Sequence, residues 1–223
     1  MMAEQVVLAI DTSTDVCVAL ARGGEVLATA RVQERMQHVE QLMPMVRQVC
    51  ADAELGLSSV EAITVGVGPG PFTGLRVGIV TAQVLASVLK VPLHGVCSLD
   101  VIATQWVLSA DPRPDEFVVA IDARRKEIYW ASYDADGLRV DGPHVTKPEQ
   151  VPTCAVIGPG ADLYPDRMQV APGPRLLDPG VLAACGSSMI DAGIEPLYLR
   201  RPDAAEPSRR KSTLISRPQR VRP

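Results

Sequence analysis

Short apolar runs that end in a polar residue recur along this chain. The first is Val6-Val7-Leu8-Ala9-Ile10, which ends in Asp11 and has the pattern of a buried central strand with a polar residue at its tip. Two further apolar runs flank Arg22-Gly23-Gly24-Glu25, which predicts a β-hairpin. The elements predicted next are a helix over 36–53, a strand over 62–67, the loop Gly68-Pro69-Gly70 and a helix over 73–90.

The second half of the chain repeats this order. Phe117-Val118-Val119-Ala120-Ile121 ends in Asp122, and a predicted hairpin follows with its turn at 134–137. Ala155-Val156-Ile157 then runs into Gly158-Pro159-Gly160, and a helix is predicted over 179–192. Val-Leu-Ala-Ile-Asp and Val-Gly-Pro-Gly in the first half thus match Val-Val-Ala-Ile-Asp and Ile-Gly-Pro-Gly in the second. The repeat predicts a duplicated lobe.

A lobe built as strand, hairpin, helix, strand and helix, used twice, is the ribonuclease-H-like plan of actin-type ATPases and sugar kinases. We therefore predict an α/β fold of two such lobes, with mixed sheets flanked by helices. The predicted domains are 1–108, a lobe that carries dimerisation helices, 109–202, a second lobe, and 203–223, a basic tail expected to be disordered. Fold analogy alone does not determine function.

The first predicted helix carries a continuous apolar stripe, from which Met45 is expected to be excluded. Pro44 removes a helix hydrogen bond, so a bend is expected near residues 40–44. The stripe either covers the helix's own sheet or is shared with a partner, since methionine adapts to exchangeable surfaces. Its residues are Met36, Val39, Leu42, Met43, Val46, Val49, Cys50 and Ala53.

The second predicted helix has small residues at every fourth position, Gly74, Gly78, Ala82 and Ala86. Glycine inside a helix costs about 0.5–1 kcal/mol relative to alanine, so this ridge needs a reason, and close approach of another helix is the usual one. We predict a partner interface, with packing inside the lobe as the alternative. The predicted interface residues are Met36, Val39, Met43, Val46, Cys50, Gly74, Gly78, Ala82 and Ala86.

Composition agrees with a soluble cytoplasmic protein. The 223 residues are 47% hydrophobic and 22% charged, as in a folded globular protein. We expect no membrane span, since a bilayer requires an apolar run of roughly 18–20 residues. The five cysteines are far apart, which favours free thiols over disulfides or a zinc site. The net charge is −4, yet eight basic residues against two acidic ones follow from Arg200 onward. A direct tRNA-binding module is an alternative suggested only by this tail.

Candidate chemistry is sparse, and no catalytic residue is predicted. Asp11-Thr12-Ser13 could cradle a phosphate, although the same residues also make a good structural turn. At the matching place in the second half stand Arg124-Arg125-Lys126, long cations that obstruct close backbone approach to a nucleotide but that could pair with phosphate or RNA. Gly68-Pro69-Gly70 lacks the Lys-Ser/Thr of a P-loop.

Several specific runs resemble one known family. They are VGVGPGPFTGLRVG (65–78), LAIDTST (8–14), HVEQLMP (38–44), IDAR with EIYWA (121–124 and 127–131) and EPLYLR (195–200). Together they resemble the bacterial TsaB (YeaZ) family, partner subunits in tRNA threonylcarbamoyladenosine biosynthesis within the actin-like ATPase and TsaD superfamily. The sequence departs from the usual pattern at Val67, Pro71 and Arg125-Lys126.

This resemblance implies a non-catalytic subunit. It would pair with a homologous catalytic subunit of the TsaD type, support binding of an ATPase subunit of the TsaE type, reach tRNA through the complex, and possibly form homodimers. The catalytic relative carries a metal-binding H-x-x-x-H at the positions of Ser98 and Ile102, so no metal site is expected here. No cofactor is expected on this chain, and ATP and metal are expected on the partner subunits. The alternative is a stand-alone nucleotide-dependent enzyme of the actin and sugar-kinase superfamily.

Overall fold

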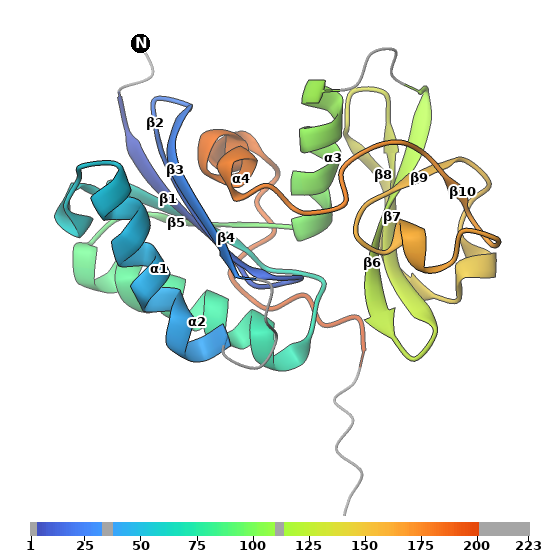
Figure 1. Ribbon diagram of the computed structural model, residues 1–223, viewed down its shortest axis with the longest axis horizontal. Helices are drawn as coiled ribbons and strands as arrows, with labels where there is room; N and C mark the ends of the chain where they lie inside the picture. The colour runs from blue at the N-terminus through green and yellow to red at the C-terminus, as the bar shows by residue number, and fades with distance from the viewer. Residues whose placement is uncertain (1–3, 33–37, 110–113, 201–223) are drawn as a thin grey trace, which may run out of the picture.

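Two five-stranded mixed sheets form the framework of the protein (Figure 1). The computed structural model describes residues 4–32, 38–109 and 114–200. The first sheet has the order β3-β2-β1-β4-β5 and the second β10-β9-β6-β7-β8. The strands are β1 Val6–Asp11, β2 Val16–Arg22, β3 Glu25–Val32, β4 Ala62–Gly66, β5 Leu93–Val96, β6 Glu116–Arg124, β7 Glu127–Asp134, β8 Arg139–Thr146, β9 Ala155–Ile157 and β10 Gln169–Val170.

The two sheets repeat one topology, which confirms the predicted duplication. In the first, β1 pairs antiparallel with β2 and parallel with β4. In the second, β6 pairs antiparallel with β7 and parallel with β9 in the same way. The two apolar runs that end in Asp11 and Asp122 are therefore the central strands β1 and β6 of a two-lobed, ribonuclease-H-like fold.

Four α-helices and four 3-10 turns are distributed unequally over this framework within the described residues. The first lobe has α1 and α2 between its strands, whereas the corresponding connections of the second lobe hold only the short turns η2 and η3. The second copy has therefore kept the sheet but not the helices. The elements are α1 His38–Asp52, α2 Phe72–Leu89, α3 Ser98–Ser109, α4 Pro179–Cys185, η1 Leu57–Ser59, η2 Pro148–Gln150, η3 Ala161–Leu163 and η4 Gly186–Ser188.

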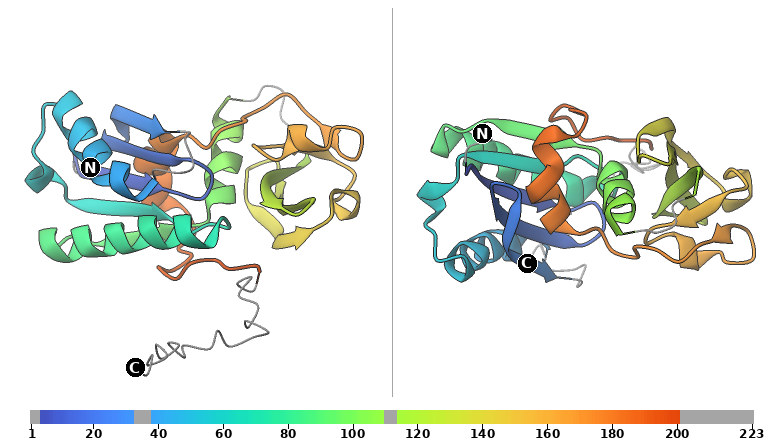
Figure 2. Two further views of the ribbon diagram at one scale, coloured as in Figure 1. Left: turned by 60° about the horizontal axis from the view of Figure 1, so that its bottom comes forward. Right: turned by 90° about the horizontal axis from the view of Figure 1, so that it is seen from above.

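Alternation along the strands divides the core between the two faces of the first sheet. The side chains of Leu8 and Ile10 pack with α1 and α2 on one face. Ala9, the residue between them, belongs instead to a core shared with α3, α4 and the second sheet. Figure 2 shows this arrangement, with α4 on the opposite side of the first sheet from α1 and α2.

Helix α4 lies in the second half of the chain but packs on β1, β2 and β3 of the first lobe. The sequence assigned this segment to a second lobe spanning 109–202, and that assignment of the helix is wrong because α4 covers the inner face of the first sheet. The helix also ends at Cys185 rather than at residue 192, and η4 continues it for one 3-10 turn.

Helix α1 covers its own sheet, with Val46 and Cys50 buried and Met43 half-buried. Met45, which the sequence analysis placed off the apolar stripe, is buried in the same core, because the stripe is wider than three- and four-residue steps suggest. Met36 lies outside the described residues, and so does the side chain of Val39. The tail over 203–223 lies outside them as well.

The small-residue ridge of α2 faces the interior of the chain. Gly78, Ala82 and Ala86 are buried, and a Cβ added at Gly78 would overlap Thr12 Oγ1. Gly74 lies against the Thr12 carbonyl oxygen, which a Cβ there would approach to 2.9 Å. The prediction that this ridge contacts a partner helix is therefore wrong, since close packing inside the lobe already accounts for the small residues.

Contrary to expectation, α2 is long and apolar enough to cross a membrane by length and composition alone, with a mean hydropathy of 1.6 over 18 residues. One third of these 18 residues is buried in the protein, where Leu75, Ile79 and Leu85 pack on the first sheet. Its outer face leaves Val80, Val84 and Val88 exposed. The high hydropathy therefore combines a core-facing side with an uncovered apolar side.

All five cysteines are free thiols, as predicted, and three of them are buried. Burial raises the pKa of the Cys97 thiol to about 12, with the neighbouring Asp100 carboxylate adding to the effect. Such a thiol is protonated at neutral pH and chemically inert. Cys17 and Cys97 are therefore core residues, whereas Cys154 and Cys185 are only half-buried.

The burial of Gly78 can be tested by the sign of the change in stability that Gly78→Ala causes. Helix propensity alone predicts that Gly78→Ala would stabilise the protein by about 1 kcal/mol. Overlap with the Thr12 side chain predicts instead a loss of about 1–3 kcal/mol in the free energy of unfolding, measured by urea denaturation. The matched control is Ser87→Ala on the exposed face of α2, expected within about 0.5 kcal/mol of the parent. A more stable Gly78→Ala protein would contradict this packing.

Candidate functional site

The carboxylate of Asp11, at the end of β1, is fully buried and fully engaged. Its Oδ1 accepts hydrogen bonds from the Ser13 backbone N–H at 2.8 Å and from Ser13 Oγ at 2.6 Å. Its Oδ2 accepts one from Ser98 Oγ at 2.6 Å. Burial raises the pKa of Asp11 above its ordinary value, although the hydrogen bonds from Ser13 and Ser98 oppose that effect. Only glycine fits at position 66, because a Cβ there would overlap this carboxylate.

These hydrogen bonds bear on the phosphate loop predicted at Asp11, Thr12 and Ser13. Thr12 Oγ1 donates to the Gly74 carbonyl oxygen at 2.8 Å, and the Ser13 hydroxyl donates to Asp11. All three residues are buried, with at most 4% of each exposed. The hydroxyl groups that a phosphate would need are therefore already used within the chain. Phosphate binding at this loop remains a prediction.

Ser98 and Ile102 lie on the first turns of α3, where the resemblance places two metal-binding histidines. Ser98 Oγ accepts a hydrogen bond from the Gly68 N–H at 3.2 Å while it donates to Asp11, so the hydroxyl links two loops of the first lobe. Ile102 is completely buried in the shared core. An isoleucine side chain and a hydroxyl do not suit a transition metal. No cluster of three potential ligands occurs among the described His, Cys, Asp and Glu residues.

The same helix also binds the second lobe. Asp100 Oδ1 accepts a hydrogen bond from the Tyr133 hydroxyl at 2.8 Å and lies 3.4 Å from Arg139 Nε. Burial raises the pKa of Asp100, whereas the Arg139 guanidinium and the Tyr133 hydroxyl oppose the rise. One turn of α3 is thus fixed by Ser98 to the first sheet and by Asp100 to the second.

A cavity of about 610 Å³ lies between the lobes. Its walls include Thr14 and Asp15 from the first lobe and Asp122 and Arg124 from the second. Asp122 is the counterpart of Asp11 but is half-buried at the cavity wall, and its Oδ2 lies 3.1 Å from Arg124 Nη1. The first central strand therefore ends in a closed hydrogen-bond network, and the second ends in an ion pair beside the cavity.

The turn between β6 and β7 holds three consecutive cationic residues in the left-handed region, Arg124 at φ 64°, Arg125 at 55° and Lys126 at 63°. Left-handed backbone costs about 1–2 kcal/mol for a residue with a Cβ, and glycine or asparagine is the usual choice in such hairpin turns. All three side chains are exposed, so core packing does not explain the choice of residue. Strain of this kind is typical of functional sites.

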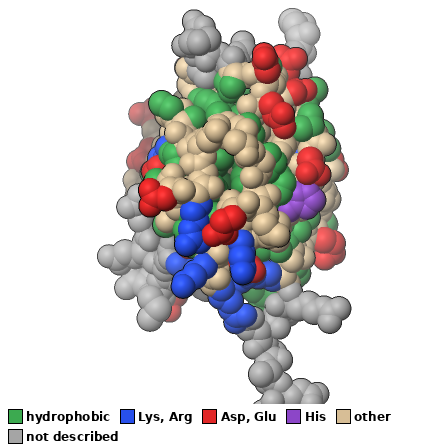
Figure 3. Space-filling model, turned by 90° about the vertical axis from the view of Figure 1, so that its right-hand side faces the viewer, with side chains coloured by type: hydrophobic (Ala, Val, Ile, Leu, Met, Phe, Trp, Pro, Cys, Tyr) green, Lys and Arg blue, Asp and Glu red, His purple; other side chains and the backbone are tan. Residues whose placement is uncertain are grey.

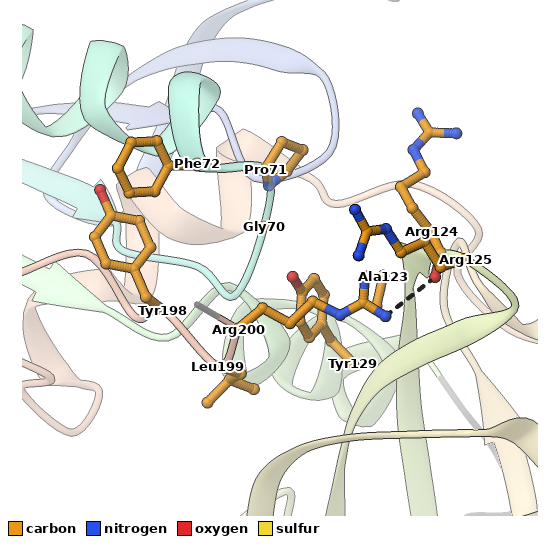
Figure 4. Close-up of a pocket in the computed structure, with 10 residues that line it drawn as sticks. All are labelled: Gly70, Pro71, Phe72, Ala123, Arg124, Arg125, Tyr129, Tyr198, Leu199 and Arg200. Atoms are coloured by element: carbon orange, nitrogen blue, oxygen red, sulfur yellow. Dashed lines mark hydrogen bonds between the residues drawn. The ribbon is translucent and has the colours of Figure 1, made fainter. Parts of the chain in front are cut away.

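Next to this turn lies a smaller pocket of about 170 Å³, formed by three separate segments (Figure 4). Phe72, at the start of α2, stacks on Tyr198 with 4.7 Å between ring centroids. Arg76 lies over the Phe72 ring at 3.8 Å and donates from Nε to the Tyr198 hydroxyl at 2.8 Å. The lining residues are Gly70, Pro71, Phe72, Ala123, Arg124, Arg125, Tyr129, Tyr198, Leu199 and Arg200.

Arg200 connects the last described segment to the second lobe. Its guanidinium forms an ion pair with Glu127 and a hydrogen bond of 3.4 Å to the Arg124 carbonyl oxygen. Upstream, the Leu197 N–H donates to the Val67 carbonyl oxygen, which holds the same segment against the first lobe. The sequence analysis included this segment in the family resemblance but gave it no role. Residues far apart in the sequence meet here, so spacing alone gave no signal.

Removing the Ser98 hydroxyl should test whether this position is structural. Ser98→Ala would leave Asp11 Oδ2 and the Gly68 N–H without their buried partner, so we expect the free energy of unfolding to fall by about 1–3 kcal/mol in urea titrations. Ser109→Ala, at the exposed end of the same helix, should change it by about 0.5 kcal/mol or less. Equal effects of the two substitutions would contradict the linking role of Ser98.

Comparison with known proteins places the chain in a family. The family model of TsaD, described as tRNA N6-adenosine threonylcarbamoyltransferase, matches residues 29–159. YeaZ from Pseudomonas aeruginosa superposes with a TM-score of 0.72 at 30% identity, over 87% of this chain and all of that one.

Two relatives in sequence extend the comparison. A protein of Mycobacterium tuberculosis is 39% identical over 204 residues, 89% of this chain and 93% of the relative. The tRNA threonylcarbamoyladenosine biosynthesis protein TsaB of Escherichia coli is 39% identical over 132 residues, which are 58% of this chain and 55% of that protein. The chain belongs to the TsaD family and, within it, to the TsaB (YeaZ) group.

Proposed function

We propose that this protein is the non-catalytic dimerisation subunit of a cytoplasmic complex that forms threonylcarbamoyladenosine in tRNA. It pairs with a homologous catalytic subunit of the TsaD type and supports binding of an ATPase subunit of the TsaE type. ATP and the metal ion are bound by those subunits. The similarity to TsaB proteins of tRNA threonylcarbamoyladenosine biosynthesis supports the pathway, and the residues of α3 support a non-catalytic role.

The non-catalytic role is inferred from the side chains at positions 98 and 102 and from what they contact. The Ser98 hydroxyl is used between Asp11 and Gly68, and the Ile102 side chain fills the shared core. A metal at this place would require two ligands where the chain has one engaged hydroxyl and one alkyl group. A metal-dependent transfer reaction therefore needs the site of another subunit.

The outer face of α2 is the surface that best suits a partner helix. Val80, Val84 and Val88 follow one another at four-residue steps and are 53%, 55% and 72% exposed. Helix α1 contacts α2 and presents the half-buried Met43. A row of valines on a surface helix is an apolar stripe of the kind that two helices bury together. This face replaces the glycine ridge as the proposed contact.

A charge on this stripe should weaken pairing without unfolding the protein. We expect Val84→Glu to weaken association with the homologous catalytic subunit at least tenfold, about 1.4 kcal/mol, because the contact would bury an unpaired carboxylate. Titration calorimetry and size-exclusion chromatography with the catalytic subunit from the same cells measure this. The melting temperature should stay near that of the parent, since Val84 is exposed.

Val140→Glu is the matched control, because Val140 is 59% exposed on β8 of the second lobe. It should leave association unchanged. If Val84→Glu pairs with the catalytic subunit as tightly as the parent does, α2 is not the interface. If the unmodified chain fails to pair at all, the proposed function itself is wrong.

The alternative function, a stand-alone nucleotide-dependent enzyme, is favoured by one observation. Thr14 Oγ1 is buried beside the interlobe cavity without a hydrogen-bond partner among the described residues. Titration calorimetry of the isolated chain with ATP and Mg²⁺ separates the two functions. The proposed role predicts no measurable heat of binding, whereas a micromolar dissociation constant, about −8 kcal/mol, together with ATP turnover would establish the enzyme.

A further inference from the structure

We propose that the turn between β6 and β7, together with the Tyr198–Arg200 segment, binds the phosphate backbone of RNA. The binding surface consists of Arg124, Arg125 and Lys126, which we call the basic turn, and of the small pocket beside it. This inference rests on the proposed function, because it assigns the RNA substrate of that complex to a site on this subunit.

The first argument is charge. Three cations, Arg124, Arg125 and Arg200, line the pocket. Lys126 follows Arg125 in the turn, and Arg76 lies over the ring of Phe72, a lining residue. The carboxylates paired with these cations are those of Asp122 and Glu127. The chain as a whole carries a net charge of −4. Figure 3 shows a group of Lys and Arg side chains gathered at one end of the second lobe. A concentrated basic area on an otherwise acidic protein indicates a polyanionic ligand.

The second argument is the aromatic platform at the pocket rim. Tyr198 is 38% exposed, stacks on Phe72 and is hydrogen-bonded to Arg76, so its ring is held in place. Figure 4 shows the Phe72 and Tyr198 rings side by side, with Arg200 between them and the side chains of Arg124 and Arg125. An exposed ring beside a row of arginines is the combination that receives an unstacked base of single-stranded RNA next to its phosphates.

The third argument is pocket size, which distinguishes polymer from free nucleotide. A volume of about 170 Å³ is below the range of about 300–1,000 Å³ in which whole small molecules bind. The pocket can hold one phosphate group, while the exposed cations of the turn contact its neighbours along a strand. A whole free nucleotide, with its base and ribose, needs a larger site than this pocket.

The fourth argument is backbone strain. Arg124, Arg125 and Lys126 all occupy left-handed backbone, where glycine or asparagine would be less strained. None of the three is buried, so the side chains do not contribute to the core. Arg200 further fixes the turn through Glu127 and the Arg124 carbonyl oxygen. Cationic residues thus occupy backbone positions that favour glycine or asparagine, and Arg200 holds the turn in place.

The test uses the full chain, a fluorescein-labelled tRNA transcript and a labelled single-stranded anticodon-loop RNA, with fluorescence anisotropy read across a series of salt concentrations. The double variant Arg125→Gly/Lys126→Gly is the key protein, because glycine suits the positive φ at both positions and should preserve or raise the melting temperature. We expect its RNA affinity to fall at least tenfold. The slope of log affinity against log salt should become shallower by about 1.4, the value for two lost contacts to single-stranded phosphates.

The matched control is Arg22→Glu, an exposed arginine at the β2–β3 hairpin of the first lobe, which should leave RNA binding unchanged. A glycine variant that binds RNA like the parent would overturn the inference, and so would a parent chain that does not bind RNA. Competition with ATP and with inorganic phosphate separates the possible ligands. The competitors are compared at equal concentrations of phosphate groups. If ATP or inorganic phosphate displaces the labelled RNA as well as unlabelled RNA does, the site binds a small anion and the RNA proposal is wrong.

Association with the catalytic subunit is measured on the same glycine variant. It should be normal, because the basic turn lies in the second lobe and the proposed partner face lies on α2. Normal association with unchanged RNA affinity would refute this inference and leave the proposed function intact. Lost association of the parent chain would refute the proposed function, while the RNA measurement would still report on the basic turn.

Discussion

Packing of α3 between the two sheets joins the lobes, since this helix contacts β6, β7 and α4 and belongs to the core shared with β1. Side chains of β1, β6 and α4 meet this helix in one continuous apolar core, so the lobes share an interior instead of touching at a surface. Hydrogen bonds fix the same helix turn at both sides, through Ser98 to Asp11 and through Asp100 to Tyr133. Relative motion of the lobes would have to open a dry core and break buried polar contacts.

The two copies of the lobe differ in the surroundings of the equivalent aspartates, Asp11 and Asp122. In the first copy the strand-end carboxylate is buried and saturated by serine hydroxyls, and the helices are kept. In the second copy the carboxylate lies at a cavity wall and pairs with arginine, and the helices between the strands are lost. The first lobe thus offers helix surface for protein contact, and the second offers an uncovered basic end.

Much of the fold follows from local pattern, because buried central strands and their polar tips are encoded by consecutive residues such as Val6 to Asp11. The duplication was predictable for the same reason. The tertiary packing was not predictable, because Gly74 and Gly78 look the same in sequence whether they face a partner helix or Thr12. The membership of α4 in the first lobe likewise depends on contacts more than 150 residues away along the chain, as between Val26 and Gly180. The Phe72–Tyr198 stack unites segments that no spacing rule connects.

The place of α4 has a consequence for synthesis on the ribosome. Strands β1, β2 and β3 emerge first, but the helix that covers their inner face is encoded by residues 179–185, near the end of the described chain. One face of the first sheet therefore stays uncovered until residues 179–185 have left the ribosome. Domains usually fold as units while they emerge, whereas the first lobe here takes one covering helix from a later part of the chain. Nascent chains released before α4 would expose an apolar sheet face, which makes them natural clients of chaperones and proteases.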